Sequence, residues 1–535
     1  MIKTFRRLSS VYKRIYINLK NKPILLCGIG CLLLFCTAFF IVYFTRVVYS
    51  PGWLGQINGT VVLGAVFVVI AALTLRAKKL SKSNTALCMT VLIFISGVCF
   101  ALVTPPNQVT DEPSHFLRSY AMGMGDFAFD EEQEWPNDVN LLIDNFPVAY
   151  RNGYPAEKGN SILTQFSNYF EDLENGEQGT GLGIIIFQII PYLPQAFGVF
   201  AGRLFGADAL VCYWLARIAN LAFYCVCCYF ALSWAKRFKI IMFTLMAMPL
   251  TLFIAASCNN DSMLFGLMFL LFGTVLSDSF DRKKAIAWAV CFAVLCTSKM
   301  SYIVFAPLIF VVSRDDWKLK LKKWHYAVIA VGVFCLVYFG TSLSVSLLSN
   351  YGEIPRTMSD SNPAEQLKFI LSNPLRYFVV FLDTLRNNSF FLSSGGLFGW
   401  IDVDIKLVSF LTPVVLLLAT FKNAHRFEKR DFAKVCVFFI TTLLTYGVVL
   451  TGMYLSWTPV TLPQVIGLQM RYLFPGFMGI LLTIGYWAKG YMAVQPCETK
   501  GETSSVYTSY IFALVSCLLL FAAYYLPTKV IVYVS

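Results

Sequence analysis

Long apolar runs separated by short polar segments dominate the chain. A membrane-spanning helix needs about 20 predominantly apolar residues. Runs that approach this length cover residues 24–48, 58–75, 86–103, 209–233, 240–256, 261–277, 285–300, 302–312, 325–347, 406–421, 433–455, 471–488 and 508–526. The run at 302–312 is short and adjoins its predecessor. The pattern predicts an all-α integral membrane protein with about 13 transmembrane helices.

The distribution of Lys and Arg predicts which side of the membrane each connection faces. Basic residues gather within residues 3–22, 76–82, 236–239, 282–284, 318–323 and 422–430. Such segments normally stay in the cytoplasm. All of them can do so only if a further apolar stretch, 182–205, makes no simple single crossing. That stretch contains Pro191 and Pro194, which favour an interfacial or re-entrant segment. The N-terminus is then predicted inside and the C-terminus outside.

Two long loops are predicted to face outward. Residues 104–180 hold 14 Asp and Glu against three Lys and Arg, a net charge of −11. The second loop holds an amphipathic stretch, Pro363–Leu385, whose apolar positions suit one helix lying along the membrane surface. The predicted organisation is a basic arm (1–23), three transmembrane helices (24–103), an acidic loop (104–181), a transmembrane core (182–348), a second loop (349–405) and C-terminal transmembrane helices (406–535).

Composition excludes several classes of protein. The chain has 535 residues, of which 57% are hydrophobic and only 14% charged, with a mean hydropathy of +0.64. A soluble protein carries about 25% charged residues, so a soluble enzyme, a fibrous protein and a disordered chain are all excluded. The net charge of +13 reflects the cytoplasmic bias of a membrane protein, with the lipid bilayer and not nucleic acid as the expected partner.

The string Thr110–Arg118, directly after the third predicted span, contains several ionisable side chains close together in sequence. Pro113 suits the first turn of a helix, with Asp111 or Glu112 as its cap. Asp111, His115 and Arg118 then share one helix face, and Glu112 points about 100° away from Asp111. A carboxylate beside cations suits activation of a hydroxyl nucleophile next to a phosphate leaving group. A helix cap with solvated charges, or a metal bound through Asp111 or Glu112 with His115, would give the same string.

Four further ionisable residues lie within or beside the apolar runs, where charges are costly and often functional. They are Arg217, Asp261, Lys299 and Arg471. Snorkelling to lipid headgroups accounts for any one of them. Their location at outward ends of the predicted spans also fits a shared site that faces a phosphate group.

These strings resemble a bacterial family of polytopic membrane proteins of unknown function. The resemblance extends from about residue 85 to about 490, with one departure, since Met470 stands where a small residue is expected. Beyond the string Asp111–Arg118, the matching segments are Tyr192–Gln195, Leu215–Asn220, Ser257–Asp261, Ser298–Tyr302, Trp457–Pro459 and Gly467–Pro475.

That family in turn is similar to the GT-C glycosyltransferases, membrane enzymes that take sugars from polyprenyl-phosphate carriers. The resemblance implies a GT-C-like fold, with Asp111 as catalytic base and Glu112 as second carboxylate. The resemblance makes Arg118, Lys299 and Arg471 the candidates for the carrier phosphate. The predicted substrate and phosphate contacts also include His115, Arg217, Asp261, Gln469 and Tyr472. No metal ligand is implied, although some GT-C enzymes use a divalent metal, so that cofactor stays open.

The sequence therefore predicts a glycosyltransferase of the bacterial cytoplasmic membrane. Its active site is expected to face outward, and its expected partners are a polyprenyl-phosphate-linked sugar donor and a cell-envelope glycan or teichoic acid acceptor. The outer face offers no nucleotide sugar, and no glycine-rich phosphate loop occurs in the chain. A transporter or flippase of lipid-linked saccharides is the main alternative. A receptor or scaffold with an acidic loop and no catalysis is a third hypothesis.

Overall fold

The computed structural model describes residues 85–127, 134–146, 162–180, 189–348, 361–387, 397–399, 403–422 and 431–492, together with Val515. Within these ranges the regular secondary structure is helical except for one pair of two-residue strands and an isolated bridge between Phe280 and Trp317, which confirms the predicted all-α class. The predicted basic arm 1–23 and the predicted runs 24–48 and 58–75 lie outside the described residues, as does all of 508–526 except Val515.

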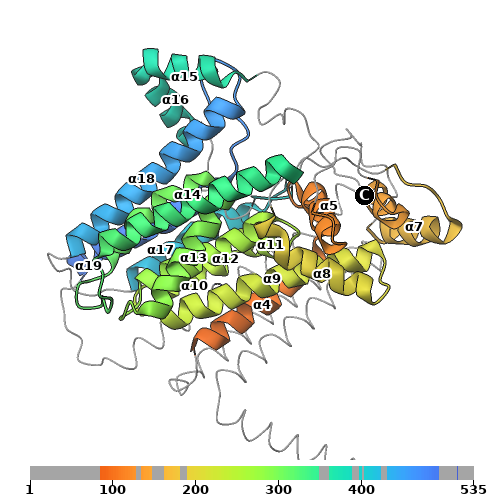
Figure 1. The fold of residues 1–535 in the computed structure, drawn as a ribbon, viewed down its shortest axis with the longest axis horizontal. Coiled ribbons are helices and arrows are strands. Elements are labelled where there is room, and N and C mark those ends of the chain that lie inside the picture. Colours follow the sequence, from red (N-terminus) through yellow and green to blue (C-terminus); the bar gives the residue numbers. More distant parts are fainter. Residues whose placement is uncertain are drawn as a thin grey trace, which may run out of the picture.

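The predicted apolar runs in the described ranges are all helical. They correspond to α4 (Thr85–Val103), α9 (Ala209–Trp234), α10 (Lys239–Met246), α11 (Pro249–Ala255), α12 (Asn260–Val275), α13 (Arg282–Ser298), the 3-10 helix η4 (Met300–Val311), α14 (Lys323–Leu348), α17 (Lys406–Lys422), α18 (Asp431–Ser456) and α19 (Met470–Met492). Figure 1 shows these helices gathered into one bundle. The run at 240–256 is divided between α10 and α11, because Pro249 begins a new helix and cannot continue the old one.

Two described helices, α9 and α18, have the length and apolar composition needed to cross a membrane. A third candidate is the pair α11 and α12, which together have the required length and apolar composition but are bent by 119° at the break between them. Such a pair is either a broken span or a re-entrant segment. The described residues thus contain two or three candidate spans, and the number thirteen stays a prediction.

The proline-containing stretch 182–205 is described from residue 189 onward and does not form one straight helix there. It contains the short 3-10 helix η3 (Ile190–Tyr192) followed by α8 (Leu193–Leu204). Leu193, Phe197, Phe200 and Leu204 are exposed at intervals of four, three and four residues, which places them on one face. The opposite face of α8 packs against α9 and the acidic loop. This arrangement is typical of an interfacial helix.

The described part of the acidic loop forms three helices beside the start of α9. They are α5 (Glu112–Gly123), α6 (Asn137–Asn145) and α7 (Ile162–Asn175), at the right of Figure 1. Their buried side chains form a separate hydrophobic cluster that includes Phe116, Leu142, Tyr169 and, from α9, Tyr213. The loop is therefore anchored by its own apolar packing, and the exposed acidic residues in its described part are Glu134, Asp144, Glu171, Glu174 and Glu177.

The predicted amphipathic stretch 363–385 is two helices and not one. Helix α15 (Pro363–Ser372) ends at Asn373, and Pro374 begins α16 (Pro374–Asn387). The helix breaks here because a proline disfavours the helical conformation of the residue before it and has no N–H for a helical hydrogen bond. Leu371, Leu375 and Phe378 remain largely exposed. Both helices lie at the C-terminal end of α18, at the top of Figure 1.

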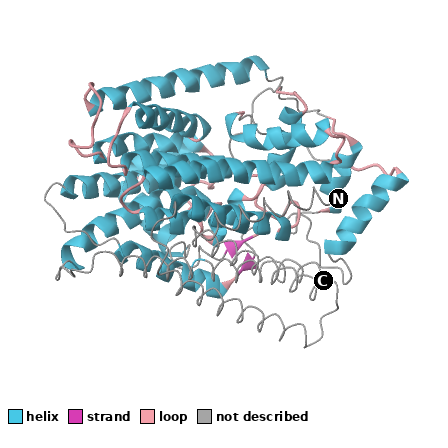
Figure 2. Cartoon of the chain, turned by 90° about the horizontal axis from the view of Figure 1, so that it is seen from below, coloured by secondary structure: helices cyan, strands magenta, loops and turns pink. Residues whose placement is uncertain are grey.

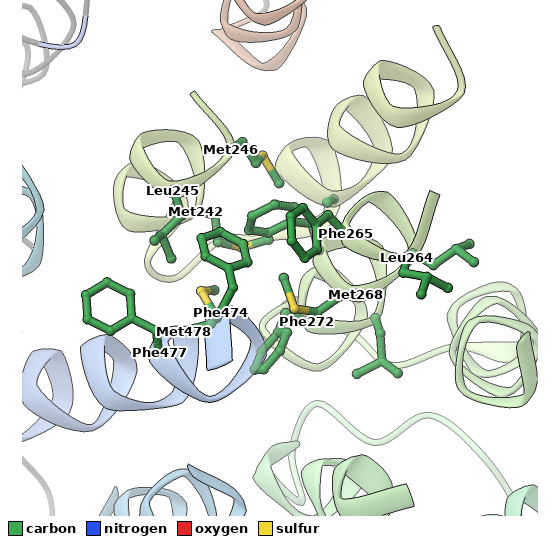
Figure 3. Close-up of a cluster of buried hydrophobic side chains, with 14 of the residues drawn as sticks. Met242, Leu245, Met246, Leu264, Phe265, Met268, Phe272, Phe474, Phe477 and Met478 are labelled. Atoms are coloured by element: carbon green, nitrogen blue, oxygen red, sulfur yellow. The ribbon is translucent and has the colours of Figure 1, made fainter. Parts of the chain in front are cut away.

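Apolar packing between distant segments holds the bundle together. Figure 3 shows side chains of α10, α12 and α19 meeting, among them Met242, Met268 and Phe474. The only described strands, β1 (Leu397–Phe398) and β2 (Val403–Asp404), pair antiparallel with Leu397 opposite Asp404, and they are the magenta segments in Figure 2. Phe398 is buried against Phe100 and Phe253, so the described end of the second loop is fixed beside α4 and α11.

Candidate functional site

Four charged side chains from distant parts of the chain form a continuous row of ion pairs. Arg471 Nη2 lies 2.5 Å from Asp111 Oδ2, and Arg471 Nε lies 3.5 Å from Asp261 Oδ2. Lys299 Nζ donates a hydrogen bond to Asp261 Oδ1. The order along the row is Asp111, Arg471, Asp261 and Lys299, so negative and positive charges alternate and their formal charges sum to zero.

The two ends of this row are accessible and its middle is buried. The Asp111 side chain is 45% exposed and the Lys299 side chain 28%, whereas Arg471 and Asp261 are only 6% and 2% exposed. A ligand that reaches the row therefore meets the Asp111 carboxylate and the Lys299 ammonium first. Buried charges are stable only when paired, and here Arg471 and Asp261 pair with each other as well as with the two ends.

The aromatic ring of Tyr472 supports both cations of the row. The ring centroid lies 5.0 Å from Lys299 Nζ and 5.1 Å from the guanidinium carbon of Arg471, within the range of cation–π attraction. Arg471 Nη2 also donates to the Tyr472 hydroxyl at 3.2 Å. Gln469 contributes its backbone carbonyl, which accepts from the Tyr472 N–H at 3.0 Å. The string Gln469–Tyr472 thus arranges the start of α19 at the row.

Asp111 takes the N-cap position of α5, as predicted, but its carboxylate does not cap the helix. The residue is left-handed, with φ 63° and ψ 7°, and makes no side-chain capping hydrogen bond. A non-glycine residue in this region is uncommon, although Asp tolerates it better than most. The backbone turn directs the carboxylate to Arg471 instead. Thr110 fixes the turn, since its carbonyl accepts from Asn259 Nδ2 at 3.1 Å and its hydroxyl donates to Gly399 O at 3.2 Å.

Helix ends position the other three members of the row. Asp261 lies in the first turn of α12, where the helix dipole favours an acid, and Asn259 caps that helix by accepting from the Asp261 N–H. Lys299 is the extended residue between α13 and η4. Arg471 lies in the first turn of α19, where the dipole disfavours a cation. Its two carboxylate partners compensate for that location.

Glu112, the neighbour of Asp111, has a different environment. Its side chain and that of Arg217 are both 0% exposed and form a bidentate ion pair. Arg217 Nε donates to Oε1 and Nη2 donates to Oε2, each at 2.8 Å. The carboxylate also accepts from the Cys258 N–H at 2.9 Å and the Val109 N–H at 3.3 Å. No surface of either side chain is available to a ligand.

The rest of the Arg217 guanidinium binds the end of α4. Its Nη1 donates to the carbonyls of Ala101 and Thr104 at 2.8 and 2.5 Å, and its Nη2 to that of Pro105 at 3.0 Å. The pair Glu112–Arg217 therefore ties together α4, α5, α9 and the turn before α12. The sequence predicts Glu112 as a second catalytic carboxylate and Arg217 as a phosphate ligand, but both side chains are fully buried. Their burial suits a structural role in which the pair holds the site together.

His115 and Arg118 face the start of α8. His115 Nδ1 and the Tyr192 hydroxyl are 2.5 Å apart. Burial, with the nearby Arg471 charge, lowers the pKa of His115 to about 4, so its imidazole is neutral at physiological pH. Burial also lowers the pKa of Arg118, to about 10, so its guanidinium stays charged. One turn further, Ser119 donates to Gln195 Oε1 at 2.8 Å.

The structure gathers five of the predicted site residues into the row and its immediate support: Asp111, Asp261, Lys299, Arg471 and Tyr472. The charges of Arg471, Asp111, Asp261 and Lys299 all act on His115, which therefore borders the row. Tyr192 borders it too, and sequence reasoning did not single it out as a site residue. Its presence in the segment Tyr192–Gln195, one of the strings that carry the family resemblance, was the available signal.

The described residues do not fit a resident metal. Among them no group of three His, Cys, Asp or Glu side chains is placed to hold an ion. The two carboxylates of the row are already paired with cations, so the donor set has no excess negative charge for a divalent ion.

The helical bundle, the candidate spans and the buried charges together define a helical membrane protein with a charged site at the ends of several helices. The family model described as "Predicted membrane protein (DUF2142)" matches residues 94–480, and the chain belongs to this family. Comparisons with curated proteins and with solved structures gave no match.

Proposed function

We propose that this protein is a membrane glycosyltransferase that transfers a sugar from a polyprenyl-phosphate carrier to an extracytoplasmic cell-envelope glycan or teichoic acid. The observation that carries the proposal is the exposed Asp111 carboxylate paired with Arg471, with the second cation, Lys299, at the other end of the same row. The reaction needs a base for a hydroxyl and positive charge for a departing phosphate, and these residues supply both. The GT-C-like likeness of the sequence supports the same reaction.

In the proposed reaction Asp111 accepts the proton of the acceptor hydroxyl. The hydroxyl oxygen forms a bond to the anomeric carbon of the donor sugar, while the bond from that carbon to the phosphate oxygen breaks. The phosphate keeps the electron pair and its added negative charge is stabilised by Arg471 and Lys299. Asp261 holds these two cations near each other, and neutral His115 adds no competing positive charge.

The carrier lipid requires a site at a membrane surface. The exposed apolar stripe of α8 lies directly after Tyr192, which borders the row of ion pairs. A polyprenyl chain in the bilayer could thus approach the row while its phosphate stays at the polar boundary. This location supports a lipid-linked donor over a soluble one.

The proposal is tested by complementation of a deletion strain, read by mass analysis of its envelope glycans. The sugar that disappears on deletion identifies donor and acceptor together. The wild-type gene should restore it, and Asp111→Asn should lower transfer by about 100-fold or more, the usual contribution of a general base. Glu174→Gln, which removes an exposed carboxylate of α7 in the same acidic loop, is the matched control and should restore the sugar. Full restoration by Asp111→Asn would disprove the catalytic assignment.

One observation favours the alternative, a transporter of lipid-linked saccharides. The break between α11 and α12 places the start of α12, with Asp261, at the charged site, and discontinuous helices often line transport sites. Proteoliposomes without acceptor distinguish the two functions. Movement of a labelled lipid-linked sugar across the bilayer would support transport, and its absence together with transfer to added acceptor would support the enzyme.

A further inference from the structure

Arg217 and Arg471 both use the guanidinium edge formed by Nε and Nη2, but they differ in how many donors of this edge make hydrogen bonds. In Arg217, Nε and Nη2 each donate to one oxygen of Glu112, at 2.8 Å. This is the bidentate geometry that arginine forms with carboxylate and phosphate groups. In Arg471, Nη2 donates to Asp111 Oδ2 at 2.5 Å, but Nε makes no hydrogen bond within the described residues. The edge of Arg471 is therefore only half filled.

The unfilled donor of Arg471 is buried and lies inside the row. Arg471 is 7% exposed, and the nearest carboxylate oxygen to its Nε is Asp261 Oδ2, at 3.5 Å, which itself accepts no hydrogen bond in the described part of the chain. This ion-pair contact is too long for a good hydrogen bond, so a ligand oxygen that accepts from Nε would supply the hydrogen bond that Asp261 does not. Tyr472 and Lys299 flank this edge, so a second cation is close to whatever binds there.

Asp111 is poorly suited to be the permanent occupant of this edge. Its carboxylate contacts Arg471 through one hydrogen bond from Nη2, is 45% exposed, and reaches the arginine from a left-handed backbone. The phosphodiester of a polyprenyl-phosphate sugar has two non-bridging oxygens, which can accept from Nε and Nη2 together, and its single negative charge replaces that of Asp111 beside Arg471.

We propose that the Nε–Nη2 edge of Arg471 is a phosphate site that Asp111 occupies in the ligand-free chain, and that phosphate binding displaces the Asp111 carboxylate. The exchange keeps charge balanced, because one anion replaces another on the same two cations. The inference rests on the proposed function for the identity of the phosphate carrier. It adds an order of events: the Oδ2 lone pair held by Arg471 becomes available for a hydroxyl proton only after the donor phosphate has bound.

The test is phosphate binding by the purified full-length protein in detergent, with farnesyl phosphate as the probe and uncharged farnesol as the control for lipid partitioning. Asp111→Asn keeps the left-handed backbone but weakens the competitor, so farnesyl phosphate should bind about tenfold more tightly, equivalent to about 1.4 kcal/mol. Asp111→Gly is also compatible with φ 63° and should give at least the same gain. Glu174→Gln changes the net charge equally outside the row and should leave affinity unchanged.

The variant Arg471→Lys tests whether phosphate binding needs the paired Nε and Nη2 donors of Arg471 or only its positive charge. It keeps the positive charge but removes the paired donors, and should weaken binding about tenfold or more. If the wild type binds farnesyl phosphate and Arg471→Lys weakens it, but both Asp111 variants bind equally or less tightly, displacement is wrong and the proposed function stands. If neither the wild type nor the Asp111 variants prefer farnesyl phosphate to farnesol, the phosphate site and the phosphate-linked donor are both wrong.

Discussion

The buried pair Glu112–Arg217 allows a quantitative test of how the site is held together. We consider Arg217→Met, which keeps much of the side-chain volume but removes every donor. It deletes two hydrogen bonds to the Glu112 carboxylate and three to backbone carbonyls of the α4 terminus. Glu112 would keep only the Cys258 and Val109 N–H groups as partners and would be a buried charge without a counterion.

The expected loss of stability is large for one substitution. Removing one partner of a buried ion pair costs about 3–5 kcal/mol, and carbonyls left without a donor add to it. At roughly 2 °C per kcal/mol for a large chain, the midpoint of thermal unfolding should fall by about 6–10 °C. The double variant Arg217→Met with Glu112→Gln removes the stranded charge, so it should be more stable than Arg217→Met alone.

The cysteines of the chain offer the assay. Eight of the ten cysteines whose side chains the structure describes are buried, so a thiol-reactive fluorescent dye reports unfolding in detergent. Arg203→Met is the matched control, because the pair Arg203–Asp138 is 20% and 14% exposed and Asp138 keeps the Ala209 N–H as a donor. It should therefore cost less, about 1–2 kcal/mol. The reasoning would be refuted if Arg217→Met melted like Arg203→Met, or if the double variant were the least stable of all.

Three other perturbations test separate parts of the structure. His115 binds a proton with a pKa of about 4 when folded against about 6.5 when unfolded, so the unfolded chain gains protons between these values. Stability should therefore fall as pH drops from 6.5 to 4, by up to about 3 kcal/mol, and His115→Gln should flatten that part of the profile of melting midpoint against pH. A Cβ on Gly198 would lie 2.4 Å from Leu215 O, so Gly198→Ala should separate α8 from α9 and cost about 1–3 kcal/mol in the same melting assay; an unchanged midpoint would contradict that packing. The buried Gln366 side-chain amide donates to the carbonyls of Tyr454, Thr458 and Pro459 and accepts from the Thr461 N–H. Gln366→Leu should therefore release α15 and speed limited proteolysis between α15 and α16. The control Leu371→Gln, at an exposed position, should leave the rate of proteolysis unchanged.

Local patterns in the sequence were sufficient for the apolar helices of the bundle and for the list of charged candidates. Apolar runs have a length that the membrane dictates, and prolines mark where helices begin, as at Pro249 and Pro374. The break at Pro374 shows the limit, because a continuous apolar period on both sides predicted one helix. The spacing of apolar residues shows which side of a helix is apolar. A change in the direction of the helix axis at one peptide leaves that spacing almost unchanged, so the spacing does not reveal the break.

Pairing among the charges was decided by tertiary structure. Asp111 and Glu112 are adjacent in sequence and indistinguishable by composition, yet one is exposed beside Arg471 and the other buried against Arg217. Their partners lie 360 and 105 residues away, and no local signal spans such distances. The sequence by itself determined a helical membrane protein with carboxylates and cations at the ends of helices. Only the fold decided which carboxylate is accessible, because successive residues at the start of a helix point in divergent directions and the packing of α4, α9, α12 and α19 determines what each one meets.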